Sequence, residues 1–451
     1  MAVPYHVHTD MTNRAHGARM APTTTENLDH PPAPGTRAIP VSPLRWADWH
    51  GRLSVGAFTW ATLFSCLALQ RFAFPAGGGL KISVATPLVL GLAAWALVSG
   101  TMTIDRRRMA LYLGLCAVAL FSVGAKINMP LGIAPRMSTA SLAYWLAITG
   151  FAALRFRRPM SETAFFRIVA LCLVVVAGAG LAQFVLQFVG LRLFAFDGIV
   201  PGNLLIEDQY AVATPMDFGL FKSNGFFLIE PSVFSQFMAL GVIVETLYFR
   251  RPVHLALFFA GLLVSVSGTG WMVLGSYIVV LAVSSGLRGL LAAVALTAGC
   301  ALAFTVLSFA LPDVADMMSG RLTEFTLPGT SGYERFVTPF MALQSVLEAA
   351  PWTIFTGVGP GGSEQLTVPY FYRLNTPVKV LMEYGAFGLT FYLGLLTVGT
   401  RTKKQAMLLV PLLVLLLLTG GYHQFSPILF AILLIGSVAF VRQDQINVRG
   451  A

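Results

Sequence analysis

Long apolar runs recur along this chain and constrain its fold more than any other feature of the sequence. Each run reaches roughly 17 to 25 residues, the length that a helix needs to cross a bilayer. The runs lie near residues 53–71, 82–100, 109–126, 138–154, 165–190, 226–249, 253–267, 270–286, 289–310, 377–399, 405–420 and 423–441. Only 11% of the 451 residues are charged, against about 25% in an average soluble protein. We therefore predict an all-α polytopic membrane protein with about twelve transmembrane helices.

One part of this assignment stays open. The segment 253–286 is either two spans or one interrupted structure, because Ser267-Gly-Thr-Gly-Trp271 is compatible with a tight turn or with a break.

Basic residues gather in alternate connections between the apolar runs, which is the bias expected of loops that face the cytoplasm. These residues are Arg14, Arg19, Arg37, Arg45, Arg52, Arg106, Arg107, Arg108, Arg155, Arg157, Arg158, Arg167, Arg250, Arg251, Arg288, Arg401, Lys403, Lys404, Arg442 and Arg449. The pattern predicts that both termini are cytoplasmic and that segments 191–225 and 311–376 are extracytoplasmic loops. It also accounts for the net charge of +10 without a nucleic-acid partner.

The remaining composition predicts a simple domain organisation. Residues 1–44 are rich in Pro, Thr, Ala and His without periodicity, which is typical of a disordered tail, here cytoplasmic. Residues 45–451 form a single transmembrane domain. The four cysteines lie inside apolar runs at unrelated spacings, as small core residues do, so we expect no disulfide framework and no metal cluster.

The segment 311–376 is a long polar insert between apolar runs, and ordered connections of this length are usually functional. Seven of the chain's 20 acidic residues fall between Asp313 and Glu383. We expect the insert to be partly helical. It also carries three spaced arginines: Arg321, Arg335 and Arg373.

The residues just before Arg335 predict where it lies in a helix. Ser331 and Glu334 fit a capping box at the start of an amphipathic helix, which would put Arg335 in the first turn. The helix dipole disfavours a cation there. An anionic partner would explain this position, and a simple pair with Glu334 or Glu324 is the alternative.

Two further features of the sequence bear on the site. Glu230 precedes Pro231, a proline suited to a first helical turn, so Glu230 is either a helix-start carboxylate or a catalytic or sugar-binding group. The glycine-rich stretch Gly357–Gly362 predicts a turn with a close backbone approach and matches no nucleotide-binding fingerprint.

Several motifs occur together in one order. They are SNGFFLIEPSVFSQF from Ser223, SGTGW from Ser267, the long loop with spaced arginines, GVGPG from Gly357 and NTPVKVLMEYGAFGL from Asn375. In this order they resemble Wzy-type polysaccharide polymerases of the O-antigen ligase and polymerase superfamily. The resemblance covers roughly residues 130–441 and implies a GT-C-like membrane fold.

The resemblance implies an activity. Such an enzyme joins undecaprenyl-pyrophosphate-linked oligosaccharide repeats into exopolysaccharide or O-antigen at the outer face of the bacterial inner membrane, without metal or cofactor. Lipid-linked repeats would be its substrate, and a chain-length regulator and a flippase of the same pathway would be candidate partners. Loop arginines would grip the pyrophosphate, a role that Arg321 and Arg335 match by position and Arg373 by proximity. Arginine suits that role because it stays charged and forks onto phosphate oxygens.

The sequence departs from the superfamily at one position. Ligases usually carry a His-Asn pair where this chain has Leu374-Asn375, which disfavours a ligase and leaves any base to a carboxylate. Glu230 is the first candidate and Glu383 the second, and a helix-start acid is an equal alternative for Glu383. Both would lie at helix mouths beside the loops.

Two other functions stay open: a ligase that moves a finished glycan, and a flippase for lipid-linked sugar. The spans contain few charged residues and no internal repeat, and both observations disfavour a carrier.

The topology is directly testable. Reporter fusions or cysteine labelling should place residues 195–222 and 313–373 outside the cytoplasm, and residues 105–108 and 401–404 inside, because the positive-inside bias fixes every connection. A cytoplasmic location for 313–373 would remove the functional interpretation altogether.

Overall fold

The computed structural model describes only part of the chain. The described residues are 54–75, 81–126, 136–191, 196, 199–206, 221–310, 312–320, 323–366, 374–399, 402–418, 426–438 and 440–441. By its contacts the chain divides into Met1–Asp48 and Trp49–Ala451, and every described residue belongs to the second unit. The predicted tail, 1–44, lies outside the described residues, and so do Arg321 and Arg373.

The described part is mostly helical, and each predicted apolar run contains one α-helix. These helices are α1 (Val55–Ala68), α2 (Ala85–Val98), α3 (Arg106–Ala125), α4 (Thr139–Gly150), α5 (Glu162–Val185), α6 (Pro231–Val244), α7 (Pro252–Ser265), α8 (Gly268–Ser284), α9 (Gly286–Ala310), α14 (Thr376–Thr397), α15 (Lys403–Leu418) and α16 (Ser426–Ser437). A helix pairs its backbone N–H and C=O groups within its own segment, as an apolar environment requires.

Five helical segments of the described chain are long and apolar enough to cross a membrane. They are Arg106–Ala125, Glu162–Val189, Pro231–Phe249, Gly286–Ala310 and Thr376–Thr397.

The described part also contains three small pairs of β-strands. The prediction of an all-α fold did not include these strands. The pairs are β1 (Ala73–Pro75) with β2 (Lys81–Ser83), β3 (Met102–Ile104) with β4 (Leu154–Phe156), both antiparallel, and β5 (Met160–Ser161) with β6 (Phe440–Val441), parallel. In the second pair Thr103 faces Arg155. The strands are two or three residues long, and they give the backbone groups of short connections a hydrogen-bonding partner.

Helix α6 lies at the centre of the core. All of its residues from Pro231 to Val244 are buried, and it packs against α7 and α8. A Cβ on Gly270, at the start of α8, would lie 2.4 Å from the carbonyl oxygen of Ser235. The absence of a side chain at Gly270 therefore lets α8 approach the first turns of α6 closely.

The ambiguity at 253–286 resolves into two helices. Helix α7 ends at Ser265, Val266 adopts a left-handed backbone with φ 44°, and α8 begins at Gly268. The tight turn is therefore at Val266, and the SGTGW motif supplies the N-cap Ser267 and the first turn of α8.

Helix α14 is interrupted within the run that the sequence predicted as one span. Gly385 has φ 70° and ψ −175°, which breaks the helix between Tyr384 and Ala386. A Cβ there would lie 2.1 Å from the carbonyl oxygen of Phe355, and a Cβ on Gly357 would lie 2.2 Å from that of Glu383. The predicted close backbone approach of the glycine-rich stretch is confirmed, with the break in α14 as its partner.

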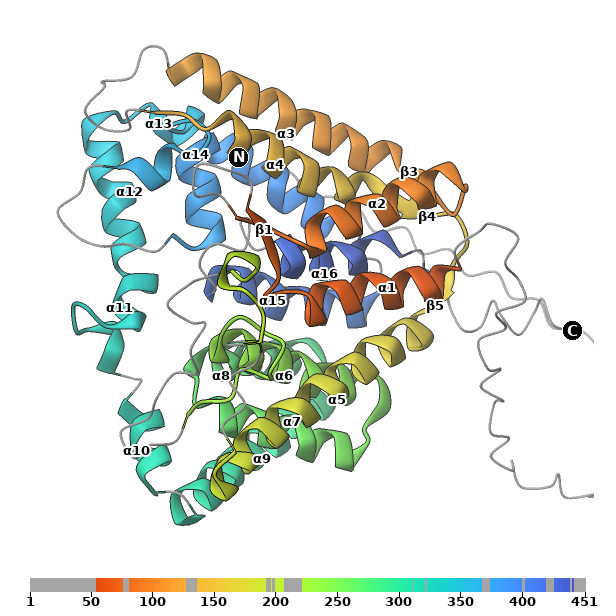
Figure 1. Cartoon of the computed structure of the whole chain (residues 1–451), viewed down its shortest axis with the longest axis vertical. Helices are drawn as coiled ribbons and strands as arrows, with labels where there is room; N and C mark the ends of the chain where they lie inside the picture. Colours follow the sequence, from red (N-terminus) through yellow and green to blue (C-terminus); the bar gives the residue numbers. More distant parts are fainter. Residues whose placement is uncertain are drawn as a thin grey trace, which may run out of the picture. The chain divides into compact units, whose positions relative to one another are not determined.

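The polar insert forms a series of short helices: α10 (Pro312–Gly320), α11 (Ser331–Phe336), α12 (Thr338–Ala349) and α13 (Thr353–Thr356). They follow one another along one end of the longer helices, whereas the pair β3–β4 lies at the opposite end (Figure 1). Since β3 leads directly into the arginine-rich start of α3, the insert and that basic connection lie at opposite ends of α3.

The expected single helix from Ser331 is wrong in two respects. Thr330 is the N-cap, with its hydroxyl accepting from the Tyr333 N–H at 3.4 Å, and the helix breaks at Val337. Pro339 explains the break, because it lacks an N–H and its ring disfavours a continuous helix. Arg335 consequently lies in the last turn of α11, where the dipole favours a cation.

Close packing at the break in α14 predicts a strong effect of small substitutions. Gly385→Ala should lower the free energy of unfolding by roughly 2 kcal/mol or more, because the added Cβ both disfavours the positive φ and meets a backbone oxygen. Gly394→Ala is the matched control on the same helix, since its Cβ would lie 3.5 Å from Leu111. Thermal unfolding in detergent measures both, and equal melting temperatures would contradict the constraint.

Candidate functional site

A buried amide network shapes the segment that leads to Glu230. The side-chain oxygen of Gln183, on α5, accepts from the hydroxyl of Ser223 at 2.9 Å and from the N–H groups of Asn224 at 3.1 Å and Phe226 at 3.3 Å. Its amide donates to Asn224 Oδ1 at 3.0 Å, and the Asn224 amide donates to the Leu228 carbonyl at 3.0 Å. A buried amide is stable only with such partners, so this part of the motif fixes the path of the backbone.

Glu230 ends this segment and is the N-cap of α6. Its backbone is extended, with φ −145°, and Pro231 occupies the first helical position. The carboxylate forms no cap hydrogen bond to its own helix. It instead accepts from the hydroxyl of Ser232 and from the guanidinium of Arg335. Glu230 is therefore a helix-start carboxylate, one of the two alternatives that the sequence left open, and its side chain is directed toward the polar insert.

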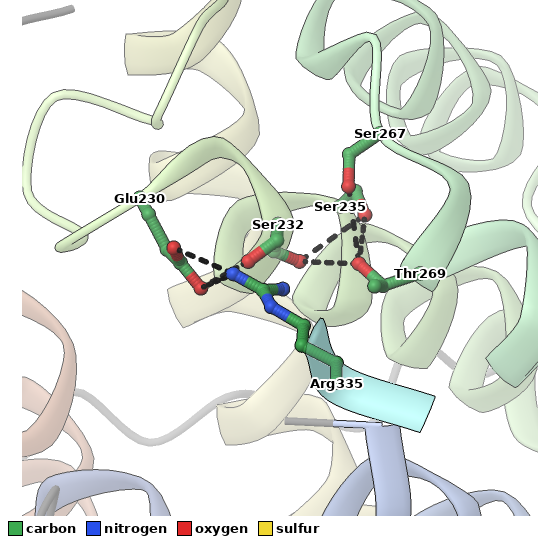
Figure 2. A network of polar contacts seen from close by, with 6 residues as sticks. All are labelled: Glu230, Ser232, Ser235, Ser267, Thr269 and Arg335. Atoms are coloured by element: carbon green, nitrogen blue, oxygen red, sulfur yellow. Dashed lines mark hydrogen bonds and ion pairs between the residues drawn. The ribbon is translucent and has the colours of Figure 1, made fainter. Parts of the chain in front are cut away.

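The ion pair with Arg335 joins the two loops that the sequence singled out. Arg335 Nη2 lies 3.2 Å from Oε2 and 3.4 Å from Oε1 of Glu230. The side chains of Arg335 and Glu230 are 10% and 14% exposed, and Figure 2 shows the guanidinium extending from α11 toward the carboxylate. Arg335 therefore pairs with an anionic side chain 105 positions away in the chain.

A set of hydroxyls lies behind the ion pair (Figure 2). The Ser232 carbonyl accepts from Ser235 Oγ at 3.2 Å and from Thr269 Oγ1 at 3.1 Å, and the Gly270 N–H donates to Ser235 Oγ at 2.8 Å. The hydroxyls of Ser267 and Thr269 are 3.1 Å apart. The SGTGW motif at the start of α8 thus holds the first turn of α6, and with it the residues that orient the Glu230 carboxylate.

Glu383, the second candidate base, belongs to a different cluster. It lies inside α14, close to the break at Gly385, and it is 1% exposed. The prediction that Glu383 lies at the start of a helix is therefore wrong, because α14 begins seven positions earlier at Thr376. Ser363 donates to Glu383 at 2.5 Å and Lys379 Nζ lies 3.5 Å from it.

Lys379 completes that cluster by pairing with Glu364, which follows the glycine-rich stretch. The lysine is 2% exposed. Sequence reasoning did not select Lys379 or Ser363, although a lysine within an apolar run is a recognisable signal, because burying a charge there is costly. Ser232 was missed as well, and an isolated serine gives no comparable signal.

Asn375 caps the N-terminus of α14. It is the N-cap of α14, 3% exposed, and its side chain accepts from the Val378 N–H at 3.0 Å. Leu374 before it is buried. Where the predicted ligase motif would have a His-Asn pair, this chain has a buried leucine and an asparagine that caps α14.

Arg321 and Arg373 lie outside the described residues, so only Arg335 of the three arginines can be placed. The four cysteines are free. A search of the sequence against protein-family models gives no match, and a search against curated proteins gives none.

Proposed function

We propose that this chain is a membrane polysaccharide polymerase that joins undecaprenyl-pyrophosphate-linked repeats at the outer face of the bacterial inner membrane. In this proposal the chain spans the membrane twelve times with both termini in the cytoplasm. The observation that carries the proposal is the ion pair of Glu230 and Arg335, which brings together the predicted base and a predicted pyrophosphate ligand. The sequence assigns these two residues different roles, and they lie on segments far apart in the chain.

The pair with Glu230 uses only one nitrogen of the guanidinium. Among the described residues, Glu230 engages Nη2 of the guanidinium, and Nη1 and Nε are the donors that a pyrophosphate oxygen would use. Arginine binds phosphate through two such donors at once. Because the guanidinium is only 10% exposed, its charge is weakly screened by water and acts strongly on a nearby anion.

The chemistry follows from these two groups. The acceptor hydroxyl attacks C1 of the donor sugar, the bond from C1 to the pyrophosphate oxygen breaks, and its electron pair leaves with the pyrophosphate. Arg335 stabilises the charge that develops on this leaving group. As the arginine turns toward the phosphate, Glu230 keeps the Ser232 hydroxyl as a partner and accepts the proton of the acceptor hydroxyl.

A ligase is the nearest alternative, and the cap position of Asn375 after Leu374 gives it no support from this structure. A carrier for lipid-linked sugar is supported by a separate observation. Lys379 and Glu383 are buried on α14, which is broken at Gly385, and buried ionisable groups beside interrupted helices are typical of transporters.

Site variants distinguish these functions. In polymerisation assays with purified protein and lipid-linked repeats, Glu230→Gln should reduce the rate roughly 100-fold or more, because it removes the proton acceptor. Arg335→Ala should reduce it roughly 10- to 150-fold, the value of one charge-assisted contact. Arg335→Lys should recover part of this loss, because lysine keeps the positive charge but cannot donate two parallel hydrogen bonds to the phosphate.

Glu348→Gln is the matched control, because Glu348 is an exposed acid on α12 of the same insert. Strains carrying the site variants should accumulate unpolymerised repeat on the outer leaflet, whereas a carrier defect would trap it on the cytoplasmic side. Long polymer at the normal rate from Glu230→Gln and Arg335→Ala would refute the assignment.

A further inference from the structure

One peptide unit just before Glu230 is held by buried side-chain amides at both of its polar ends. The unit joins Leu228 to Ile229, which are both buried. Its carbonyl oxygen accepts from the amide of Asn224 at 3.0 Å, and its N–H donates to Oε1 of Gln70 at 2.9 Å. Because a peptide unit is planar, two hydrogen bonds at its opposite ends fix its orientation.

Gln70 reaches this peptide unit from a distant part of the chain. It lies two positions after Ala68, the last residue of α1, and it is 0% exposed. Its hydrogen bond to Ile229 spans 159 positions. At the other end of the unit, Asn224 is itself held by the amide of Gln183 on α5. The peptide unit is therefore anchored to α5 and to the segment that follows α1.

The anchored peptide unit restricts the backbone of Glu230. On its other side Glu230 is already fixed to α6, because its carbonyl accepts from the Phe234 N–H at 3.2 Å and Pro231 has a restricted φ. Only the backbone dihedral angles of Ile229 and Glu230 separate the anchored unit from the helix. Loss of the hydrogen bond from Gln70 would let this short connection, and with it the Glu230 carboxylate, change position.

The amide of Gln70 contributes more to orientation than to stability. Its Nε2 is buried and has no hydrogen-bond partner among the described residues, and an unsatisfied buried donor is costly. This cost opposes the gain from the hydrogen bond that Oε1 makes to Ile229. An apolar side chain of equal length would remove both effects. What it could not supply is the acceptor that fixes the peptide unit before Glu230.

We propose that Gln70 is a positioning residue, whose amide oxygen fixes the peptide unit before Glu230 and thereby directs the Glu230 carboxylate toward the acceptor hydroxyl. This inference rests on the proposed function, in which Glu230 accepts the proton of that hydroxyl. A general base acts only within hydrogen-bond reach of the proton, and a displacement of about 1 Å can reduce a rate roughly 100-fold. Gln70 acts through Glu230 and needs no contact with substrate.

Polymerisation kinetics of the purified protein test this role. Gln70→Met keeps the length of the side chain and removes the amide acceptor. It should lower kcat roughly 10-fold or more with little change in KM, because the base is displaced while Arg335 still binds the pyrophosphate. In the Glu230→Gln protein the same substitution should have no further effect on kcat, because its only route to the reaction is Glu230. A general structural defect would lower kcat by the same factor in both backgrounds.

Gln187→Met is the matched control. Gln187 holds the start of the same segment, where its side chain accepts from the Phe221 N–H at 2.7 Å and donates to the Phe221 carbonyl at 3.0 Å. Because Phe221 lies nine positions before Glu230, this variant should keep the kcat of the unmodified protein. Gln70→Asn is a second test variant, which shortens the side chain by one methylene group and keeps the amide. It should lower kcat in the same way as Gln70→Met.

The failures of the two proposals are distinguishable. Normal kcat in Gln70→Met and Gln70→Asn, together with an inactive Glu230→Gln, would overturn the role of Gln70 alone. Equal losses in the two backgrounds, or absence of folded protein in both Gln70 variants, would show that Gln70 serves stability and would overturn its role as well. Normal kcat in Glu230→Gln would refute the proposed function itself.

Discussion

The first turn of α6 carries the interaction on which the arrangement of the candidate site depends. Glu230 begins this turn, pairs with Arg335 from the polar insert, and accepts from the neighbouring Ser232. The carbonyl of Ser232 is in turn held by Ser235 and by Thr269. One short stretch of backbone therefore connects the core helices with the insert. Removing either charge would leave the other largely buried and unpaired, which is costly.

Glycines make this arrangement possible by allowing backbone to approach backbone. Gly270 brings α8 against Ser235, and Gly357 and Gly385 bring the glycine-rich stretch against the break in α14. The two contacts serve different clusters, since the first supports the pair of Glu230 and Arg335 and the second surrounds Glu383. The insert thus contacts the longer helices through α11 and through the stretch that follows α13, and α12 and α13 also pack against α14.

The sequence predicts local features well and misses those that depend on distant contacts. Hydropathy is a local property, so every apolar run contains a helix, and the helix start at Glu230 follows from the local signal of Pro231. The pairing of Glu230 with Arg335 and the buried position of Glu383 depend on how segments far apart in the chain pack. The helical position of Arg335 was mispredicted because the capping pattern at Ser331 outweighed the effect of Pro339. The break at Gly385 was missed because a glycine in an apolar helix is often tolerated.

A double-mutant cycle on the free energy of unfolding tests the central claim most directly, namely that Glu230 and Arg335 interact across the two loops. The cycle compares Glu230→Gln, Arg335→Gln and the double variant with the unmodified protein in detergent. For a pair this buried we expect the double variant to be less destabilised than the sum of the single variants, with a coupling energy of roughly 1 to 3 kcal/mol. Additive effects within about 0.5 kcal/mol would contradict the pairing.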